Sequence, residues 1–84
     1  MFKYKHGFRG GSTGATVDTG YVYSQVYYIV AIVRTRSSVA EFEAFINSGN
    51  DAFGKTSRFS MDSNNSILIT LSAYEVADMF IKLR

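Results

Sequence analysis

Val26-Tyr-Tyr-Ile-Val-Ala-Ile-Val33 is the longest apolar run of this chain. A helix that spans a membrane needs about 20 apolar residues, so this shorter run predicts a buried strand. Apolar side chains fall on both faces of the run, which is typical of a strand in the middle of a sheet. We expect the strand to extend over about residues 21–35, with Tyr21, Tyr23 and Tyr27 on one face.

A second strand and a glycine-rich connection precede this run. Residues 2–9 alternate between two kinds of side chain, which predicts a half-buried strand whose solvent face is cationic. Five of the seven glycines lie in residues 7–20. Glycine permits a positive φ, so this segment predicts a flexible turn or a long hairpin tip. The apolar side of the first strand consists of Phe2, Tyr4, His6 and Phe8.

Two serine capping boxes predict two helices. In such a box the serine hydroxyl accepts a hydrogen bond from a free helix N–H, and a glutamate three residues later reaches back to the serine backbone. Ser38 to Glu41 and Ser72 to Glu75 have this pattern. The first helix would end near Gly49, and the second would run to the C-terminus. The helical stripes are Val39, Phe42, Phe45 and Ile46 in the first and Val76, Met79, Phe80 and Leu83 in the second.

A hairpin is expected between the two helices. Residues 55–62 and 67–71 have strand patterns, and Ser63-Asn-Asn-Ser66 suits a turn because Asn tolerates the left-handed region. The element order is then ββαββα in a single domain, residues 1–84. It predicts an α+β fold with two layers, a four-stranded, mainly antiparallel sheet and both helices on one face. We expect function on the open face. The helices could cover either face.

The composition argues against catalysis and metal binding. The chain has no cysteine, so it has neither a disulfide nor a thiolate metal site. A single histidine, His6, without an acidic cluster makes a zinc site unfavourable. Glu41 and Glu43, two residues apart on a helix, would point to different faces, so no pair of catalytic carboxylates forms. We therefore expect a non-enzymatic protein without a cofactor. The N-terminus lacks an apolar signal core, which predicts a cytoplasmic location.

One stretch matches a phosphate-binding loop. Residues 49–56 satisfy the pattern G-x-x-x-x-G-K-[ST]. That loop needs a strand before it and a helix after it, because backbone N–H groups at the helix N-terminus hold the phosphates. Here the predicted order is reversed, with a helix before the loop and a strand after it. We interpret Gly49 as a helix end and Gly54 as a turn residue, and reject nucleotide binding.

The charges are distributed unevenly along the chain. Residues 1–36 contain five cations and one acid, a net charge of +4, whereas residues 37–84 contain four cations and six acids, a net charge of −2. This asymmetry predicts a basic face. Tyrosines on the long strand would share that face. The candidate binding residues are Lys3, Lys5, Arg9, Tyr21, Tyr23, Arg34 and Arg36.

A basic face with tyrosines is compatible with two kinds of partner. Cations neutralise phosphates, and exposed aromatic rings stack on unpaired bases, so RNA or another single-stranded nucleic acid is one. Tyrosine and arginine are also common anchors of protein interfaces, so a larger protein is the other. A strand at a sheet edge could also pair with a partner or with a second copy, giving a homodimer.

The chain resembles, in its size and build, the small inhibitors that bacteriophages encode against host defences. It enters a strand at once (MFKYKHGFRGG) and contains two capping boxes within 84 residues that include no Cys, Pro or Trp. Anti-CRISPR proteins and antagonists of toxin systems belong to this class. The resemblance implies a stoichiometric inhibitor that blocks a ribonucleoprotein or nuclease in the cytoplasm of a bacterial host. Many such inhibitors are strongly acidic, whereas this chain has a pI of about 9.0.

Overall fold

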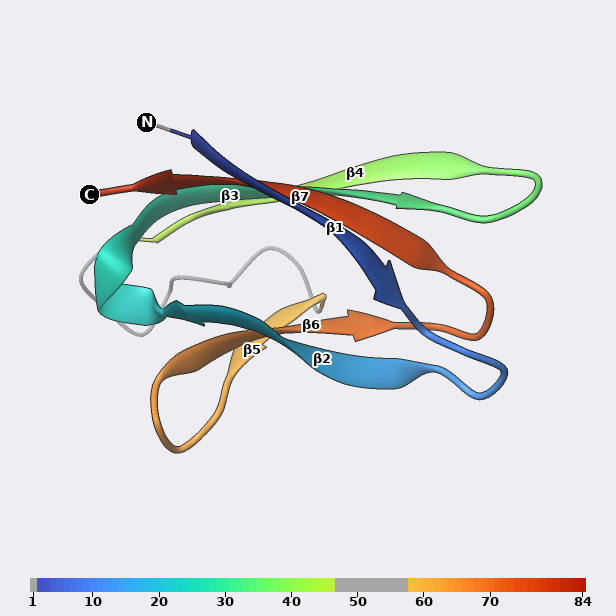
Figure 1. Ribbon diagram of the computed structural model, residues 1–84, viewed down its shortest axis with the longest axis horizontal. Helices are drawn as coiled ribbons and strands as arrows, with labels where there is room; N and C mark the ends of the chain where they lie inside the picture. The colour runs from blue at the N-terminus through green and yellow to red at the C-terminus, as the bar shows by residue number, and fades with distance from the viewer. Residues whose placement is uncertain (1, 47–57) are drawn as a thin grey trace.

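The computed structural model describes residues 2–46 and 58–84, and strands dominate this part of the chain (Figure 1). Each strand pairs with its neighbours in antiparallel orientation. The described elements are β1 (Phe2–Arg9), β2 (Ala15–Val22), the 3-10 helix η1 (Tyr23–Gln25), β3 (Val26–Arg34), β4 (Val39–Phe45), β5 (Phe59–Met61), β6 (Ser66–Leu71) and β7 (Val76–Leu83).

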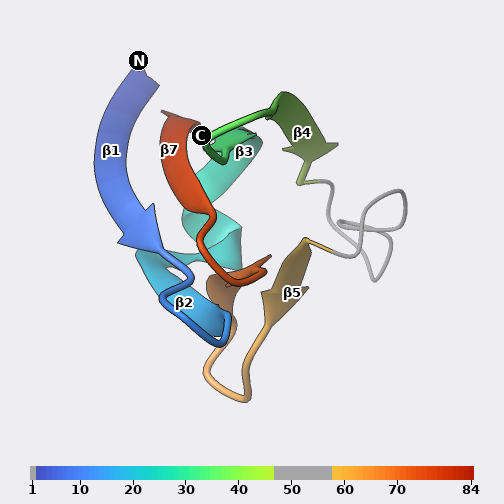
Figure 2. The same ribbon diagram turned by 90° about the vertical axis from the view of Figure 1, so that its right-hand side faces the viewer.

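The strands form two sheets that stack face to face (Figures 1 and 2). Sheet A has the strand order β1-β7-β3-β4, and sheet B has the order β2-β6-β5. Strand β3 lies between β7 and β4, so the apolar run that it contains is central in its sheet, as its composition predicts. The inner faces of both sheets are mainly apolar and cover each other.

The hydrophobic core lies between the sheets. Ile29 and Ile81 from sheet A and Ile67 and Ile69 from sheet B are fully buried. The one buried polar side chain described, Thr19, donates its hydroxyl to the Ile67 carbonyl over 2.8 Å, so its burial leaves no unpaired hydroxyl. The packing of two antiparallel sheets defines the fold class as all-β.

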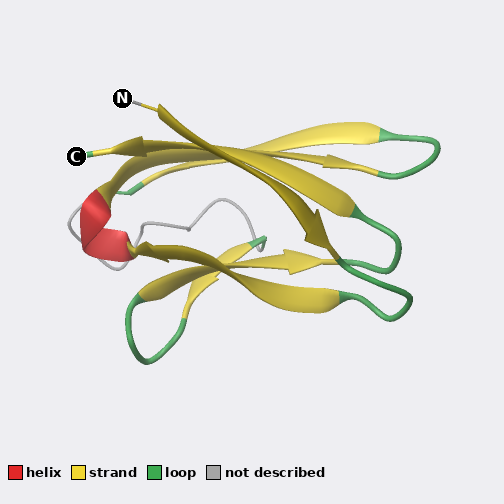
Figure 3. Ribbon diagram, in the orientation of Figure 1, coloured by secondary structure: helices red, strands yellow, loops and turns green. Residues whose placement is uncertain are grey.

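The predicted α+β fold is therefore wrong. Figure 3 shows strands where both predicted helices should lie, and η1 is the helical segment of the described chain. The order ββαββα and the layer of two helices on one face are replaced by a second sheet. No helix in residues 2–46 or 58–84 is long and apolar enough to cross a membrane.

The segment after Ser38 is strand β4, because its inward residues pack in an alternating pattern. Ala44 and Ile46 are buried and Phe42 is partly buried, at every second position. The Ser38 hydroxyl does not cap a helix but lies 2.8 Å from the Thr35 hydroxyl, in the turn between β3 and β4. The predicted helix end at Gly49 and the loop motif at residues 49–56 fall outside the described residues.

The C-terminal segment is strand β7, which pairs with both β1 and β3. The backbone N–H of Ser72 does donate to the Glu75 carboxylate over 2.6 Å, which is one of the two bonds expected of a capping box. Tyr74, however, has a φ of 64°, which ends any helical path at that residue. Apolar residues on both faces of 76–83 fit a buried strand as well as a helix, and the two ladders favour the strand.

Two other sequence predictions are corrected by the connection between the sheets. The expected long strand over 21–35 is broken at η1, where the chain passes from β2 in sheet B to β3 in sheet A. The glycine-rich segment is a turn only at about residues 10–14, and strand β2 starts at Ala15. The predicted hairpin is confirmed in residues 59–71, with Asn65 at a φ of 63° in its turn, while residues 55–57 of its predicted first strand fall outside the described residues.

Candidate functional site

The face of sheet A that points away from sheet B is the candidate site, and we call it the outer face. Strand alternation defines it. Ile29, Ala31, Met79 and Ile81 point inward and are fully buried, so their neighbours in the chain point outward. Residues opposite one another on β1, β7, β3 and β4 then form rows across the sheet.

The centre of the outer face is aromatic and aliphatic. Phe2 and Tyr4 on β1 are each 54% exposed, and Phe45 on β4 is 53% exposed. Side chains that are half-buried lie between these two edges. They are Tyr28, Val30 and Ile32 on β3 and Phe80 on β7. An apolar surface that crosses all four strands is unusual for the solvent side of a sandwich, where outward residues are commonly polar.

Ring contacts connect the aromatic side chains across the strands. Tyr4 packs on Phe80 with ring centroids 4.8 Å apart and on His6 at 5.6 Å. Tyr28 packs on Phe45 at 4.5 Å, across the pair that joins β3 to β4. Such ring pairs restrict the motion of the side chains, which lowers the entropy lost when a partner binds.

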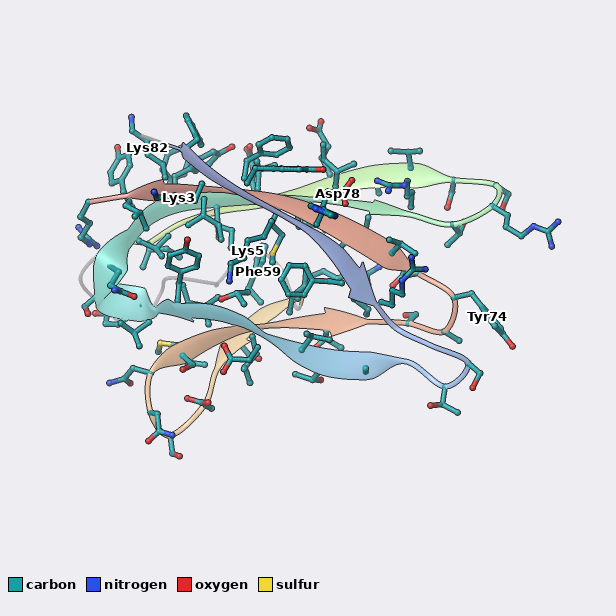
Figure 4. The ribbon with its side chains drawn as sticks, viewed as in Figure 1. Lys3, Lys5, Phe59, Tyr74, Asp78 and Lys82 are labelled. Carbon is teal, nitrogen blue, oxygen red and sulfur yellow. The ribbon has the colours of Figure 1, made fainter. Side chains whose placement is uncertain are left out.

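Charged side chains surround the apolar centre. The ammonium of Lys82 lies 5.6 Å from the Tyr27 ring centroid and 6.0 Å from that of Phe2. Arg34 forms an ion pair with Asp78 on the neighbouring strand. Figure 4 shows Lys82 near the C-terminal end of β7 and Asp78 closer to the middle of the strand. The charged residues of the outer face are Arg9, Arg34, Lys82, Glu41, Glu43 and Asp78. They comprise three cations and three acids, so the face has no net charge.

Tyr28 and Glu43 form a hydrogen-bonded pair on the outer face, and this pair shifts the pKa of the tyrosine. The Tyr28 hydroxyl donates to the Glu43 carboxylate over 2.6 Å. This hydrogen bond, with burial and the nearby acidic charges, raises the pKa of Tyr28 to about 12. The hydroxyl therefore stays protonated at neutral pH and acts as a donor that fixes the carboxylate.

The solvent side of sheet B is chemically different. Thr16 and Asp18 on β2, Ser60 on β5 and Thr70 on β6 occupy its outward positions. The hydroxyls of Thr16 and Thr70 lie 3.3 Å apart across the strands. Leu68 is the apolar residue among them and is half-buried. This side has the polar composition expected of a surface that faces water.

The sequence-predicted binding residues do not form one surface. Lys5 points between the sheets (Figure 4), where its ammonium donates to the Thr19 carbonyl over 2.8 Å and lies 4.9 Å from the Tyr21 ring centroid. Tyr21 and Tyr23 are half-buried and pack against the core. These three residues have structural roles.

The remaining predicted residues are exposed but lie apart. Lys3 pairs with Ile81 and so lies on the inner side of β1, while Arg36 lies in the turn that joins β3 to β4. Arg9 and Arg34 both pair with Val76, so the sheet brings these two cations to one end of the outer face. The structure thus groups two of the seven predicted residues on the outer face.

Sequence reasoning missed the aromatic members of the site. Phe2, Tyr4 and His6 were assigned to the buried side of their strand, but all three are exposed. A β-bulge between Lys5 and Phe8, with Gly7 at a φ of 83°, turns Phe8 inward while Phe2 and Tyr4 stay outward. The run 26–33 was the sequence signal for this apolar surface. Both of its faces are apolar, and one covering layer leaves one of them exposed.

No model of a known protein family matches the chain, and neither the curated proteins nor the solved structures contain a similar one. Within the described residues, no three His, Asp or Glu side chains are grouped to hold a metal ion. The function must therefore be argued from the outer face itself.

Proposed function

We propose that this chain is a non-enzymatic protein-binding module that docks on a partner protein through the outer face of sheet A. The difference between the two solvent sides carries the proposal. Sheet B presents threonines, serine and aspartate to water, whereas sheet A presents Phe2, Tyr4 and Phe45, each more than half exposed. Contiguous apolar surface of this kind marks interaction sites.

The arrangement of the outer face supports a protein partner. Protein interfaces have an apolar centre that excludes water and a polar rim, and tyrosine and arginine are frequent anchors. Here Val30, Phe80 and Tyr4 lie at the centre, and ionic groups such as Arg34 and Lys82 lie at the ends of the strands. The ordered ring pairs limit the entropy that side chains lose on binding.

The charge balance argues against RNA as the main ligand. Affinity for single-stranded nucleic acid depends on cations that neutralise phosphates. The outer face combines three cations with three acids, and Arg34 is already paired with Asp78. We therefore prefer the protein-binding hypothesis to the nucleic-acid one. A stoichiometric inhibitor of a larger defence complex, the role that the resemblance implies, is our proposal for its biological use.

The proposal is tested by capture of partners on immobilised protein. Phe2→Thr with Tyr4→Thr removes two exposed rings but keeps residues that favour strands. We expect the wild type to retain a defined set of proteins that the double variant loses. Tyr74→Asn is the matched control, since it removes a ring that is 72% exposed in the turn between β6 and β7, beside Arg9 and Val76 at one end of sheet A.

Two results would contradict the proposal. The first is retention of the same proteins by the wild type and the double variant. The second is tight binding of a mixed-sequence single-stranded RNA, measured by fluorescence anisotropy, with a steep loss of affinity as salt rises.

A further inference from the structure

The four sheet edges of the described chain differ in how well they are protected. An edge strand exposes unpaired backbone N–H and C=O groups, and proteins protect such edges with bulges, inward charges or short strands. In sheet A the edges are β1 and β4. Strand β1 has a bulge between Lys5 and Phe8, and Lys5 points inward. It is therefore protected in two ways.

Both edges of sheet B are also protected. The pairing of β2 with β6 shifts register between Asp18 and Val22, and Gly20 has a φ of 85° there. Strand β5 has only three residues. Neither offers a long regular ladder to a new strand.

Strand β4 has no bulge, no inward charge and no short length, and its charges are the two outward glutamates Glu41 and Glu43. Its seven residues pair with β3 without a register shift, from Tyr28–Phe45 to Arg34–Val39. It contains no proline, lysine or glycine. Within residues 2–46 and 58–84, sheet A ends at this strand.

Two hydrogen bonds identify the backbone groups that β4 leaves unpaired. The N–H of Ile46 donates to the Tyr27 carbonyl over 2.8 Å, and that of Thr35 donates to the Ser38 carbonyl over 2.9 Å. In an antiparallel ladder every second residue bonds to the neighbour, so the even-numbered residues of β4 face β3. The N–H and C=O groups of Val39, Glu41, Glu43 and Phe45 therefore point away from the sheet.

We propose that β4 accepts an extended strand of the partner protein, with Lys or Arg at two alternate positions opposite Glu41 and Glu43. The backbone groups of β4 would pair with those of the incoming strand, the mode known as β-augmentation. Both glutamates lie on the outer face, so the incoming strand extends that face. The inference rests on the proposed function, because it specifies how the same partner docks.

The charges of β4 indicate whether its edge pairs with a strand of a partner protein or with a second copy of this chain. If two β4 strands paired antiparallel about Phe42, Glu41 of each copy would lie opposite Glu43 of the other. Registers shifted by two residues place Glu41 opposite Glu41 or Glu43 opposite Glu43. Like charges that lie directly opposite destabilise a pair of strands, whereas opposite charges stabilise it. Pairing of two β4 edges is therefore unfavourable, whereas pairing of β4 with a cationic strand is favourable.

The test uses a short blocked peptide that alternates lysine with valine and threonine, titrated into labelled protein and followed by NMR. We expect chemical-shift changes at the amides of Val39, Glu41, Glu43 and Phe45, together with slower hydrogen exchange there. The same peptide with glutamate in place of lysine should not bind. Affinity should fall between about 50 mM and about 300 mM salt, because the ion pairs are exposed.

Two variants separate the charge from the backbone. Glu43→Gln keeps the outward N–H and should bind roughly threefold more weakly. Glu43→Pro loses the same charge and also the outward N–H, without removing a bond to β3, so its peptide binding should be abolished. Equal binding by these two variants would overturn the proposal, as would peptide-induced shifts confined to β1.

Two outcomes distinguish this inference from the proposed function. If captured partners depend on Phe2 and Tyr4 but bind Glu43→Pro normally, the edge proposal is wrong and the outer-face proposal stands. If the free protein shows concentration-dependent shifts at the β4 amides, the occupant is a second copy, and the edge proposal is wrong.

Discussion

Tyr74 holds a backbone conformation that tyrosine rarely adopts. Its φ is 64°, and the residue is 72% exposed, so packing of the ring offsets little of the strain. Glycine adopts this conformation without the clash of a Cβ atom. We predict that Tyr74→Gly raises the free energy of unfolding by about 0.5–1 kcal/mol, measured by urea denaturation.

Asn65 provides the control for this prediction. Its φ of 63° is nearly the same, but asparagine tolerates the left-handed region. Asn65→Gly should therefore change stability little. A loss of stability in Tyr74→Gly would show that the tyrosine side chain contributes to the fold despite its exposure.

The Glu75 carboxylate is held by several hydrogen bonds within the described chain. Its carboxylate accepts two hydrogen bonds from Arg58 and one from the Ser72 N–H. The hydrogen bonds from Arg58, more than the other contacts, hold the pKa of Glu75 below its ordinary value. Because the folded-state pKa is depressed, the stabilisation is present above the unfolded pKa of about 4.3 and is lost as the pH falls through the folded value.

We predict that Glu75→Gln lowers the free energy of unfolding by about 1–2 kcal/mol at pH 7. The difference between wild type and variant should shrink when unfolding is measured below the unfolded pKa of about 4.3, as the pH falls through the folded value. Glu41→Gln, at an exposed position on β4, is the control and should change the free energy of unfolding little at pH 7. A difference for Glu75→Gln that is independent of pH would contradict this account.

At the residue scale, the sequence placed strand β1 correctly but assigned the sides wrongly for residues before the β-bulge, whereas Phe8 and Arg9 lie on the predicted sides. Alternation predicts which residues share a face, and it does not say which face is covered. Lys5 satisfies its charge with the Thr19 carbonyl and the Tyr21 ring between the sheets, which requires a second sheet that the sequence pattern did not predict. The seven predicted binding residues were therefore dispersed.

At the scale of elements, the turn between β6 and β7 packs directly on the turn between β1 and β2. The N–H of Gly10 donates to the Glu75 carbonyl over 2.9 Å, and the N–H of Tyr74 donates to the Gly11 carbonyl over 2.7 Å. A Cβ atom on Gly10 would lie 2.0 Å from the Ser72 carbonyl oxygen. This contact is backbone against backbone, so no side chain can move to relieve it.

We predict that Gly10→Ala lowers the free energy of unfolding by about 3 kcal/mol, because the two turns must separate. Gly11→Ala is the comparison. Its φ of 68° strains an alanine, but no atom lies within 4 Å of the new Cβ, so about 1 kcal/mol is expected. Thermal unfolding of both variants provides the measurement. An equal or reversed order would show that the turns do not pack as described.

The helix predictions failed at this scale because local signals were ambiguous. A capping-box bond forms at Ser72 and Glu75, yet it closes a turn that leads into a strand. Residues 76–83 have apolar side chains on both faces, although Asp78 and Lys82 alternate with them on one, so both helical and strand periods fit the segment. The segment forms a strand because it pairs with β1 and β3. These pairings join residues far apart in the chain, so a local sequence pattern does not predict them. By contrast, the run 26–33 and the hairpin of 59–71 were predictable. The length of the run and the turn residues of the hairpin are each compatible with strands alone.

At the scale of the whole molecule, the two solvent sides of the sandwich have different compositions. One side is polar and the other is aromatic with balanced charges. The sequence indicated a binding protein, but a basic face was expected where the structure has a neutral one. The pairing of β1 with β7, of β7 with β3 and of β3 with β4 brings Tyr4, Phe80 and Phe45 onto one surface.

Amide cross-saturation in the complex with a captured partner tests the central claim most directly. Irradiation of the partner should attenuate amide signals at the outer face, centred on Tyr4, Val30 and Phe80, and leave those of Thr16 and Thr70 on sheet B unchanged. Attenuation centred on Thr16 and Thr70 would contradict the claim that the outer face of sheet A is the binding surface.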